Sequence, residues 1–190
     1  MPSTHLSLHY HVIFCTKGRR RIIAEPWRAE LHAYIGGIVR DIGAVARSIG
    51  GPGDHVHVLL GLKATHTLAD VVRQAWGDRP AVRRPRSGVP TRSGVSGCER
   101  KPDRAQPPKN GGPDATQMKR GSSAWIHQHG VGKFAWQEGY GAFTVSPSQL
   151  NKVERYIANQ MEHHRNKTFE EEYVDLLRFS GVEVDEGYLE

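Results

Sequence analysis

The sequence predicts an α+β fold, a ferredoxin-like sandwich built on a central antiparallel sheet, and two observations indicate it. Outside one insertion, the expected order is strand, helix, strand, strand, helix, strand, helix, which is the split βαβ arrangement with an added C-terminal helix. In the expected strands, apolar residues either alternate with polar ones or form continuous apolar runs, and in the expected helices they recur at helical spacing. The 190 residues suffice for one domain over 1–190 but not for two large ones.

Hydrophobic patterning places these elements along the chain. Runs rich in β-forming residues, bounded by glycine or charged turns, predict strands. Apolar residues at helical spacing predict helices, with Pro26 suited to the first turn of one and Thr67 able to cap another. We expect strands at 6–16, two within 44–62 and one at 134–146, and helices at 25–42, 67–75, 119–130, 148–165 (capped at Ser146 or Ser148) and 169–179.

A basic segment at about 76–118 interrupts this order. It holds seven of the eleven prolines and nine lysines and arginines against four acidic residues, with almost no large aliphatic side chains. Because such a segment buries too little apolar surface to offset its ordering entropy, the sequence predicts a disordered insertion.

The charge balance indicates an anionic partner, since the formal net charge is +6 and the pI is about 9.5. Nucleic acid is favoured over a membrane surface because no basic amphipathic stretch with a strong apolar face occurs. The N-terminus lacks a basic leader with an apolar run, and no stretch is long enough to span a bilayer. The two cysteines, Cys15 and Cys98, form neither a disulfide framework nor a zinc knuckle, so we expect a cytoplasmic protein.

Two pairs of residues carry candidate chemistry. His55 and His57 stand two apart in an expected strand, so alternation sends both imidazoles to one face, where they could bind a divalent metal. Tyr156 and Gln160 stand four apart in an expected helix, which aligns a hydroxyl nucleophile with an amide ligand. Each pair alone is weak evidence, because half-buried histidines and helical Tyr–Gln pairs are common in ordinary packing.

Neighbouring residues compete with this interpretation. His9 and His11 have the same spacing as the first pair, and for them we favour structural or DNA-proximal roles. Asp54 should point to the opposite face of the strand from His55, so we interpret it as a turn former. His164 shares the helical face of Tyr156 and could support the metal ligands or contact DNA, although a solvated polar helix end is about as plausible.

The chain resembles the small single-tyrosine transposases of the HUH nuclease superfamily, which include those associated with repetitive palindromic elements. The resemblance rests on YHVIFCTKGRR, GGPGDHVHVLLGL, SSAWIH, FAWQEGYGAFTVS and VERYIANQMEHHR, and so covers most of the chain outside the insertion. That family carries a His-hydrophobic-His strand motif and a catalytic tyrosine followed four residues later by glutamine. The matching positions are His55, Val56, His57, Tyr156 and Gln160.

The resemblance implies an HUH nuclease core that cleaves and rejoins single-stranded DNA at hairpin-flanked sites through a 5′-phosphotyrosine. Tyr156 would be the nucleophile, and His55, His57 and Gln160 would hold Mg²⁺ or Mn²⁺. The chemistry suits these residue types, because a metal can neutralise phosphate oxygens and a phenolate both attacks and leaves well. The resemblance also implies a homodimer in which the tyrosine helix is carried over to the other subunit.

Basic residues give candidate DNA contacts outside the catalytic pairs. The turn after the first strand should be exposed, and its cations are suited to phosphates, although charge runs are commonly only solvated loops. The candidate DNA-binding residues are Lys17, Arg19, Arg20, Arg21 and His164.

Two alternatives stay open beside an active transposase. A rolling-circle-type HUH endonuclease shares the same site but usually belongs to a larger chain. A catalytically silent or domesticated protein would bind DNA hairpins without turnover, the insertion having compromised activity.

Overall fold

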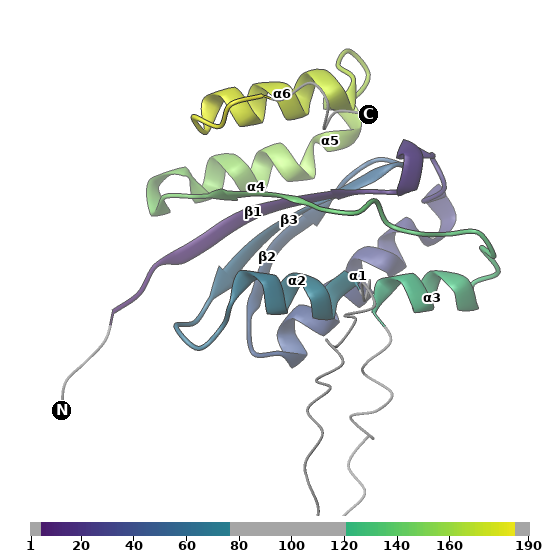
Figure 1. The fold of residues 1–190 in the computed structure, drawn as a ribbon, viewed down its shortest axis with the longest axis horizontal. Helices are drawn as coiled ribbons and strands as arrows, with labels where there is room; N and C mark the ends of the chain where they lie inside the picture. Colours follow the sequence, from purple (N-terminus) through teal and green to yellow (C-terminus); the bar gives the residue numbers. More distant parts are fainter. Residues whose placement is uncertain (1–4, 77–120, 185–190) are drawn as a thin grey trace, which may run out of the picture.

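The computed structural model describes residues 5–76 and 121–184. Within them, four strands form one antiparallel sheet in the order β2-β3-β1-β4 (Figure 1). The strands are β1 (Leu8–Cys15), β2 (Val45–Gly50), β3 (His55–Leu62) and β4 (Gly141–Thr144). This strand order, with a helical crossover after β1 and another after β3, confirms the ferredoxin-like α+β sandwich.

Helices cover both faces of the sheet. Figure 1 shows α1, α2 and α3 on one side and α4, α5 and α6 on the other. The helices are α1 (Glu25–Asp41), α2 (Leu68–Trp76), α3 (Ser122–Gln128), α4 (Leu150–Ala158), α5 (Gln160–His163) and α6 (Phe169–Phe179), with short 3₁₀ turns η1 (Lys17–Arg19) and η2 (Pro147–Gln149). None of the helices in this described part of the chain is long and apolar enough to cross a membrane.

The central strand β3 is buried on both faces, and its alternation separates two environments. Val56, Val58 and Leu60 belong to the main core, which packs against α1, α2 and α3. Leu59 belongs instead to a second cluster with Ile157 of α4. Because His55 and His57 alternate with the first set, they face the α4–α6 side.

The approach of α4 to the sheet is close. An added Cβ at Gly50, the last residue of β2, would lie 2.4 Å from the backbone oxygen of Ile157. Only glycine allows the helix to sit at this distance, so this residue helps to set the position of α4.

Four expectations from the sequence were wrong in detail. The expected helix at 148–165 is broken at Asn159, whose φ/ψ of −97°/15° ends α4 and starts α5. Neither Ser146 nor Ser148 caps it through a side chain; η2 precedes α4, and Gln149 occupies the N-cap. Only Gly141–Thr144 of the expected strand at 134–146 is a strand. Before it Trp136 forms one isolated bridge with Thr16, and Gly139, with a φ of 87°, interrupts the extended chain.

The fourth difference concerns α2, which continues to Trp76 instead of stopping at Gln74 or Ala75. Its expected cap is confirmed, since the backbone N–H of Asp70 donates to Thr67 Oγ1 at 3.1 Å. The predicted disordered insertion, apart from its first residue, lies outside the described residues.

Candidate active site

The histidine pair lies on the inner strand β3, at its first and third residues. His55 is opposite Cys15 and His57 opposite Ile13 in the β1–β3 ladder. The side chains of both histidines are fully buried, and their ring centroids are 4.9 Å apart. The expectation that both imidazoles share one face of a central strand is confirmed.

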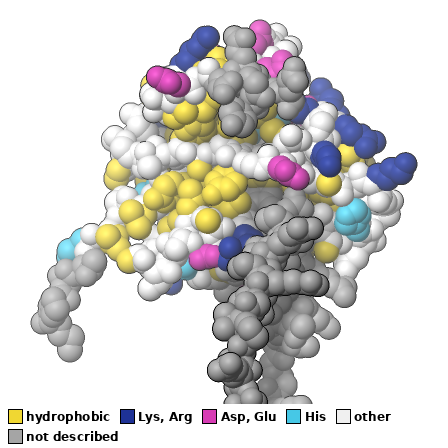
Figure 2. Space-filling view, viewed as in Figure 1, with side chains coloured by type: hydrophobic (Ala, Val, Ile, Leu, Met, Phe, Trp, Pro, Cys, Tyr) yellow, Lys and Arg dark blue, Asp and Glu magenta, His cyan; other side chains and the backbone are white. Residues whose placement is uncertain are grey.

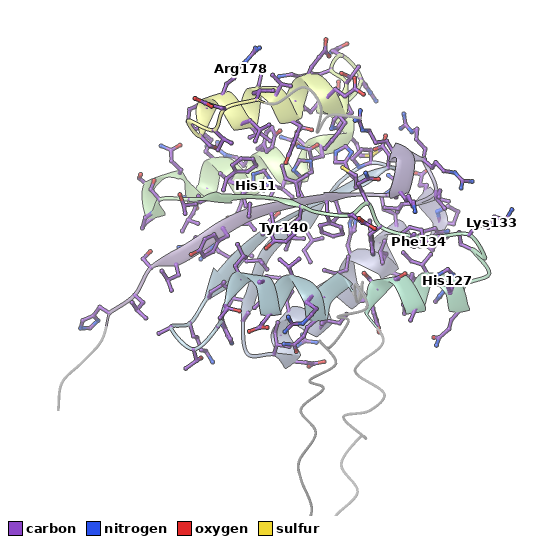
Figure 3. The ribbon with its side chains drawn as sticks, viewed as in Figure 1. His11, His127, Lys133, Phe134, Tyr140 and Arg178 are labelled. Atoms are coloured by element: carbon purple, nitrogen blue, oxygen red, sulfur yellow. The ribbon has the colours of Figure 1, made fainter. Side chains whose placement is uncertain are left out.

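In each imidazole of the pair, the Nδ1 atom lies within hydrogen-bond distance of a neighbouring side chain. His55 Nδ1 lies 2.8 Å from Asp54 Oδ1, so Asp54 does not point away as we expected; a carboxylate at the strand end can turn back to its neighbour. His57 Nδ1 lies 2.9 Å from His11 Nε2. Figure 3 shows His11 on the side of β1 that faces α4. Burial lowers the pKa of His11 to about 4 and that of His57 well below its ordinary value, so both are neutral at pH 7.

Tyr156 and Gln160 reach the same place despite the helix break between them. The Tyr156 ring stands edge-on to those of His57 and His11, at centroid distances of 5.9 and 6.0 Å. Tyr156 is half-buried and also lines an open groove between α4–α5 and α6. Tyr156 therefore lies beside His57 and His11 and also borders the groove.

Sequence reasoning missed a central residue of the site, Glu172 of α6. Its side chain is 2 % exposed, and Oε1 accepts hydrogen bonds from the Tyr156 hydroxyl and from Gln160 Nε2, the latter at 2.9 Å. Burial, reinforced by Asp54, raises the pKa of Glu172 to about 8. A signal existed, because Glu172 falls on the apolar stripe of α6 between Phe169 and Leu176.

A capping box fixes the start of α6. Thr168 Oγ1 accepts from the Glu171 backbone N–H at 3.3 Å, and Glu171 Oε2 accepts from the Thr168 backbone N–H at 2.9 Å. This arrangement orients the first turn of α6, from which Glu172 points into the site.

His164 follows α5 and also turns towards Glu172. Its Nε2 lies 2.9 Å from Glu172 Oε2, while its Nδ1 lies 2.9 Å from the backbone oxygen of Lys167. His163 is more exposed and its Nε2 lies 3.8 Å from Glu172 Oε1. Burial lowers the pKa of both histidines. The structure thus brings His164 to the site predicted for Tyr156 and Gln160.

The chemistry of these side chains fits a divalent metal ion. His55 Nε2, His57 Nε2 and Gln160 Oε1 are buried and have no hydrogen-bond partner among the described residues. Buried polar atoms normally have a hydrogen-bond partner. These three atoms have none, and each has a lone pair that can bind a metal ion. His55, His57, His164 and Glu172 each offer one ligand atom, and these four atoms lie within 4.8 Å of one another.

Comparison with known proteins decides the family. The family model described as "Transposase IS200 like" matches residues 4–79 and 115–160. The chain belongs to the IS200-like transposase family. The matched ranges include His55, His57, Tyr156 and Gln160, whereas His164 and Glu172 lie beyond them.

Two solved structures are similar to this chain at low sequence identity. A protein described as a transposase from Deinococcus radiodurans R1 shares 22% identity, with 84% of this chain and 95% of that chain covered and a TM-score of 0.46. A REP-associated tyrosine transposase bound to a REP hairpin shares 10% identity, with 86% and 73% covered and a TM-score of 0.47. No curated protein gives a significant match.

The basic turn of this transposase lies at the same end of the sheet as His55. Thr16, just before the turn, donates its backbone N–H to the Asp54 backbone oxygen at 2.8 Å. Lys17, Arg20 and Arg21 are exposed, whereas Arg19 pairs with Glu170 of α6. Figure 2 shows Lys and Arg side chains gathered at this end of the molecule. Contact of these residues with DNA stays a prediction.

Proposed function

We propose that this transposase cleaves and rejoins single-stranded DNA at hairpin-flanked sites through a 5′-phosphotyrosine on Tyr156. The observation that supports it is the position of the Tyr156 hydroxyl, which is bound to Glu172 beside the buried His55–His57 pair and borders an open groove. A phosphodiester entering that groove would meet the candidate nucleophile, and the unpaired metal-ligating atoms lie buried beside it.

The residues present can perform both halves of the reaction. Tyr156 attacks the phosphorus while Glu172 Oε1, which accepts its hydrogen bond, receives the phenol proton. The bond to the 3′-oxygen breaks, and that oxygen takes a proton from water and leaves as a hydroxyl. In the joining step a 3′-hydroxyl attacks the phosphotyrosine and Tyr156 leaves, so the bond energy is conserved without a nucleotide cofactor.

The proposal includes a bound divalent ion, Mg²⁺ or Mn²⁺. His55, His57 and Gln160 would hold it, consistent with the unpaired atoms His55 Nε2, His57 Nε2 and Gln160 Oε1. When bound, the metal supplies positive charge that neutralises the non-bridging oxygens of the scissile phosphate.

The DNA partner is proposed to be a single strand carrying hairpin elements. Lys17, Arg20 and Arg21 are exposed near the site and suited to phosphate oxygens. His164 is turned towards Glu172, and its contact with DNA stays a prediction from the sequence. A homodimer in the cytoplasm remains part of the proposal, although within one chain Tyr156 already lies against its own His57.

A denaturing-gel assay tests the proposal. Purified protein is incubated with 5′- and 3′-labelled single-stranded hairpin oligonucleotides from the DNA flanking the gene, with Mn²⁺ or EDTA. We expect a metal-dependent covalent adduct on the 3′-side fragment that disappears in Tyr156→Phe. Tyr140→Phe, a change at an exposed tyrosine just before β4, should leave the adduct unchanged.

Each other outcome has a defined meaning. Hairpin binding by the wild-type chain without any adduct would replace the proposal with the silent or domesticated hairpin-binding protein. Cleavage of the oligonucleotides with an adduct on Tyr156 but without joining of the strands would instead support a rolling-circle-type endonuclease.

A further inference from the structure

Four ligand atoms from three separate segments converge on one point in the buried part of the site. His55 and His57 come from β3, His164 from the residue after α5, and Glu172 from α6. We propose that these four residues together bind one transition-metal ion, through three imidazole Nε2 atoms and a carboxylate oxygen. This inference rests on the proposed function and adds His164 and Glu172 to its metal ligands.

The orientation of the imidazoles supports this assignment. In each ring the outer nitrogen, Nδ1, is engaged: by Asp54 in His55, by His11 in His57 and by the Lys167 backbone oxygen in His164. Histidines that bind metals are held in this way, with the second ring nitrogen fixed by a carboxylate, a carbonyl or another polar group. The three Nε2 atoms are left facing inwards, buried and without a hydrogen-bond partner in the described structure.

The distances between these atoms favour a shared cation. Since His164 Nδ1 faces a carbonyl oxygen that can only accept, its Nε2 carries a lone pair, yet it lies 2.9 Å from Glu172 Oε2. His55 Nε2 lies 3.8 Å from the same oxygen, and His57 Nε2 lies 3.7 Å from Oε1. A single proton on Glu172 could bridge to one nitrogen only, whereas a metal ion would be a partner for all three.

The donor set selects the class of metal. Three imidazoles and one carboxylate suit Zn²⁺, Co²⁺ or Mn²⁺, whereas Mg²⁺ prefers an octahedral set of oxygens. Gln160 Oε1 stays available as a further oxygen ligand, because it is also buried without a partner. The amide nitrogen of Gln160 meanwhile donates to Glu172 Oε1 at 2.9 Å and helps to orient the carboxylate.

The experiment measures Co²⁺ binding to the full chain carrying Tyr156→Phe. No DNA is present, so the measured affinity does not depend on catalysis. After removal of metals with a chelator, Co²⁺ is titrated and its visible absorption gives the affinity. Glu172→Gln and His164→Gln should each weaken Co²⁺ binding by at least about tenfold. The matched controls Glu170→Gln and His163→Gln alter neighbours outside the four and should stay within about twofold of the parent.

A second measurement on the unsubstituted chain covers the case in which a variant fails to fold. X-ray absorption at the zinc edge should show three imidazoles and a carboxylate bound to Zn²⁺. Two imidazoles only, or Co²⁺ affinities unchanged by Glu172→Gln and His164→Gln, would overturn the inference and leave the proposed function standing. A four-residue metal site in a chain that forms no DNA adduct would overturn the proposed function and leave this inference standing.

Discussion

The hydroxyl of Tyr156 donates a hydrogen bond to Oε1 of Glu172, sixteen residues further along the chain. This bond joins α4, which carries the candidate nucleophile, to α6, and it does so beside the buried histidines of β3. The C-terminal helix is therefore part of the candidate site and not an appendage to the ferredoxin-like core.

The first prediction concerns the stability of Tyr156→Phe. The change removes one hydrogen bond but keeps the ring contacts with His57 and His11, so we expect a loss of about 0.5–1.5 kcal/mol in the free energy of unfolding. Urea denaturation followed by circular dichroism measures it, with Tyr140→Phe as the control. A loss of several kcal/mol would mean that Tyr156 is chiefly a structural residue.

The second prediction concerns Gly50, where β2 meets α4. A Cβ there would lie 2.4 Å from the Ile157 backbone oxygen, so Gly50→Ala should destabilise the chain by about 1–3 kcal/mol and weaken adduct formation by shifting Tyr156. Gly37→Ala, in open space on α1, should instead stabilise the chain by about 0.4–1 kcal/mol. Equal effects of the two changes on unfolding would refute the close contact.

The third prediction is a pH dependence of stability that arises in α1. Burial, together with Arg28, lowers the pKa of His32 to about 4. Because the unfolded state binds more protons between that value and the ordinary pKa of about 6.5, stability falls as the pH drops through this window. Between pH 7 and 5, His32 should account for a loss of up to about 2 kcal/mol in the free energy of unfolding.

The substitution His32→Gln isolates this contribution from those of other histidines. The variant should lose less stability than the wild type between pH 7 and 5, as measured by urea denaturation at each pH. Parallel losses in the two proteins would show that His32 is not held neutral by burial.

The fourth prediction concerns the salt dependence of DNA binding. Alanine at Lys17, Arg20 and Arg21 together should lower the slope of log affinity against log salt by about 2 for single-stranded DNA, since each lost phosphate contact removes about 0.7. Arg40→Ala, at the far end of α1, is the control. Fluorescence anisotropy at several salt concentrations measures the slope, and an unchanged slope would remove the basic turn from the DNA interface.

Local patterns in the sequence were enough to predict most of the fold and half of the candidate site. The alternation in β3 placed His55 and His57 on one face, and helical spacing brought Tyr156 and Gln160 together. The first inference needed only the regular geometry of a strand. The second assumed an unbroken helix, and it holds because both side chains still reach Glu172 across the break at Asn159.

The parts that failed depend on contacts between distant segments. No glycine or proline near Asn159 indicates that the helix breaks there. Glu172 lies in a run of three glutamates, of which the other two, Glu170 and Glu171, are exposed. The apolar stripe of α6 separates Glu172 from these neighbours, but only the docking of α6 shows that this carboxylate meets Tyr156 and Gln160. The same holds for His11, whose role behind His57 depends on the register of β1 and β3.

The most direct test of the central claim is to map the covalent attachment site on the protein. After reaction with single-stranded hairpin DNA and Mn²⁺, nuclease trimming and proteolysis, mass spectrometry should find a nucleotide joined through its 5′-phosphate to Tyr156. A nucleotide on any other residue, such as Tyr140 or Tyr173, or cleaved DNA with unmodified Tyr156 throughout the reaction, would contradict the account.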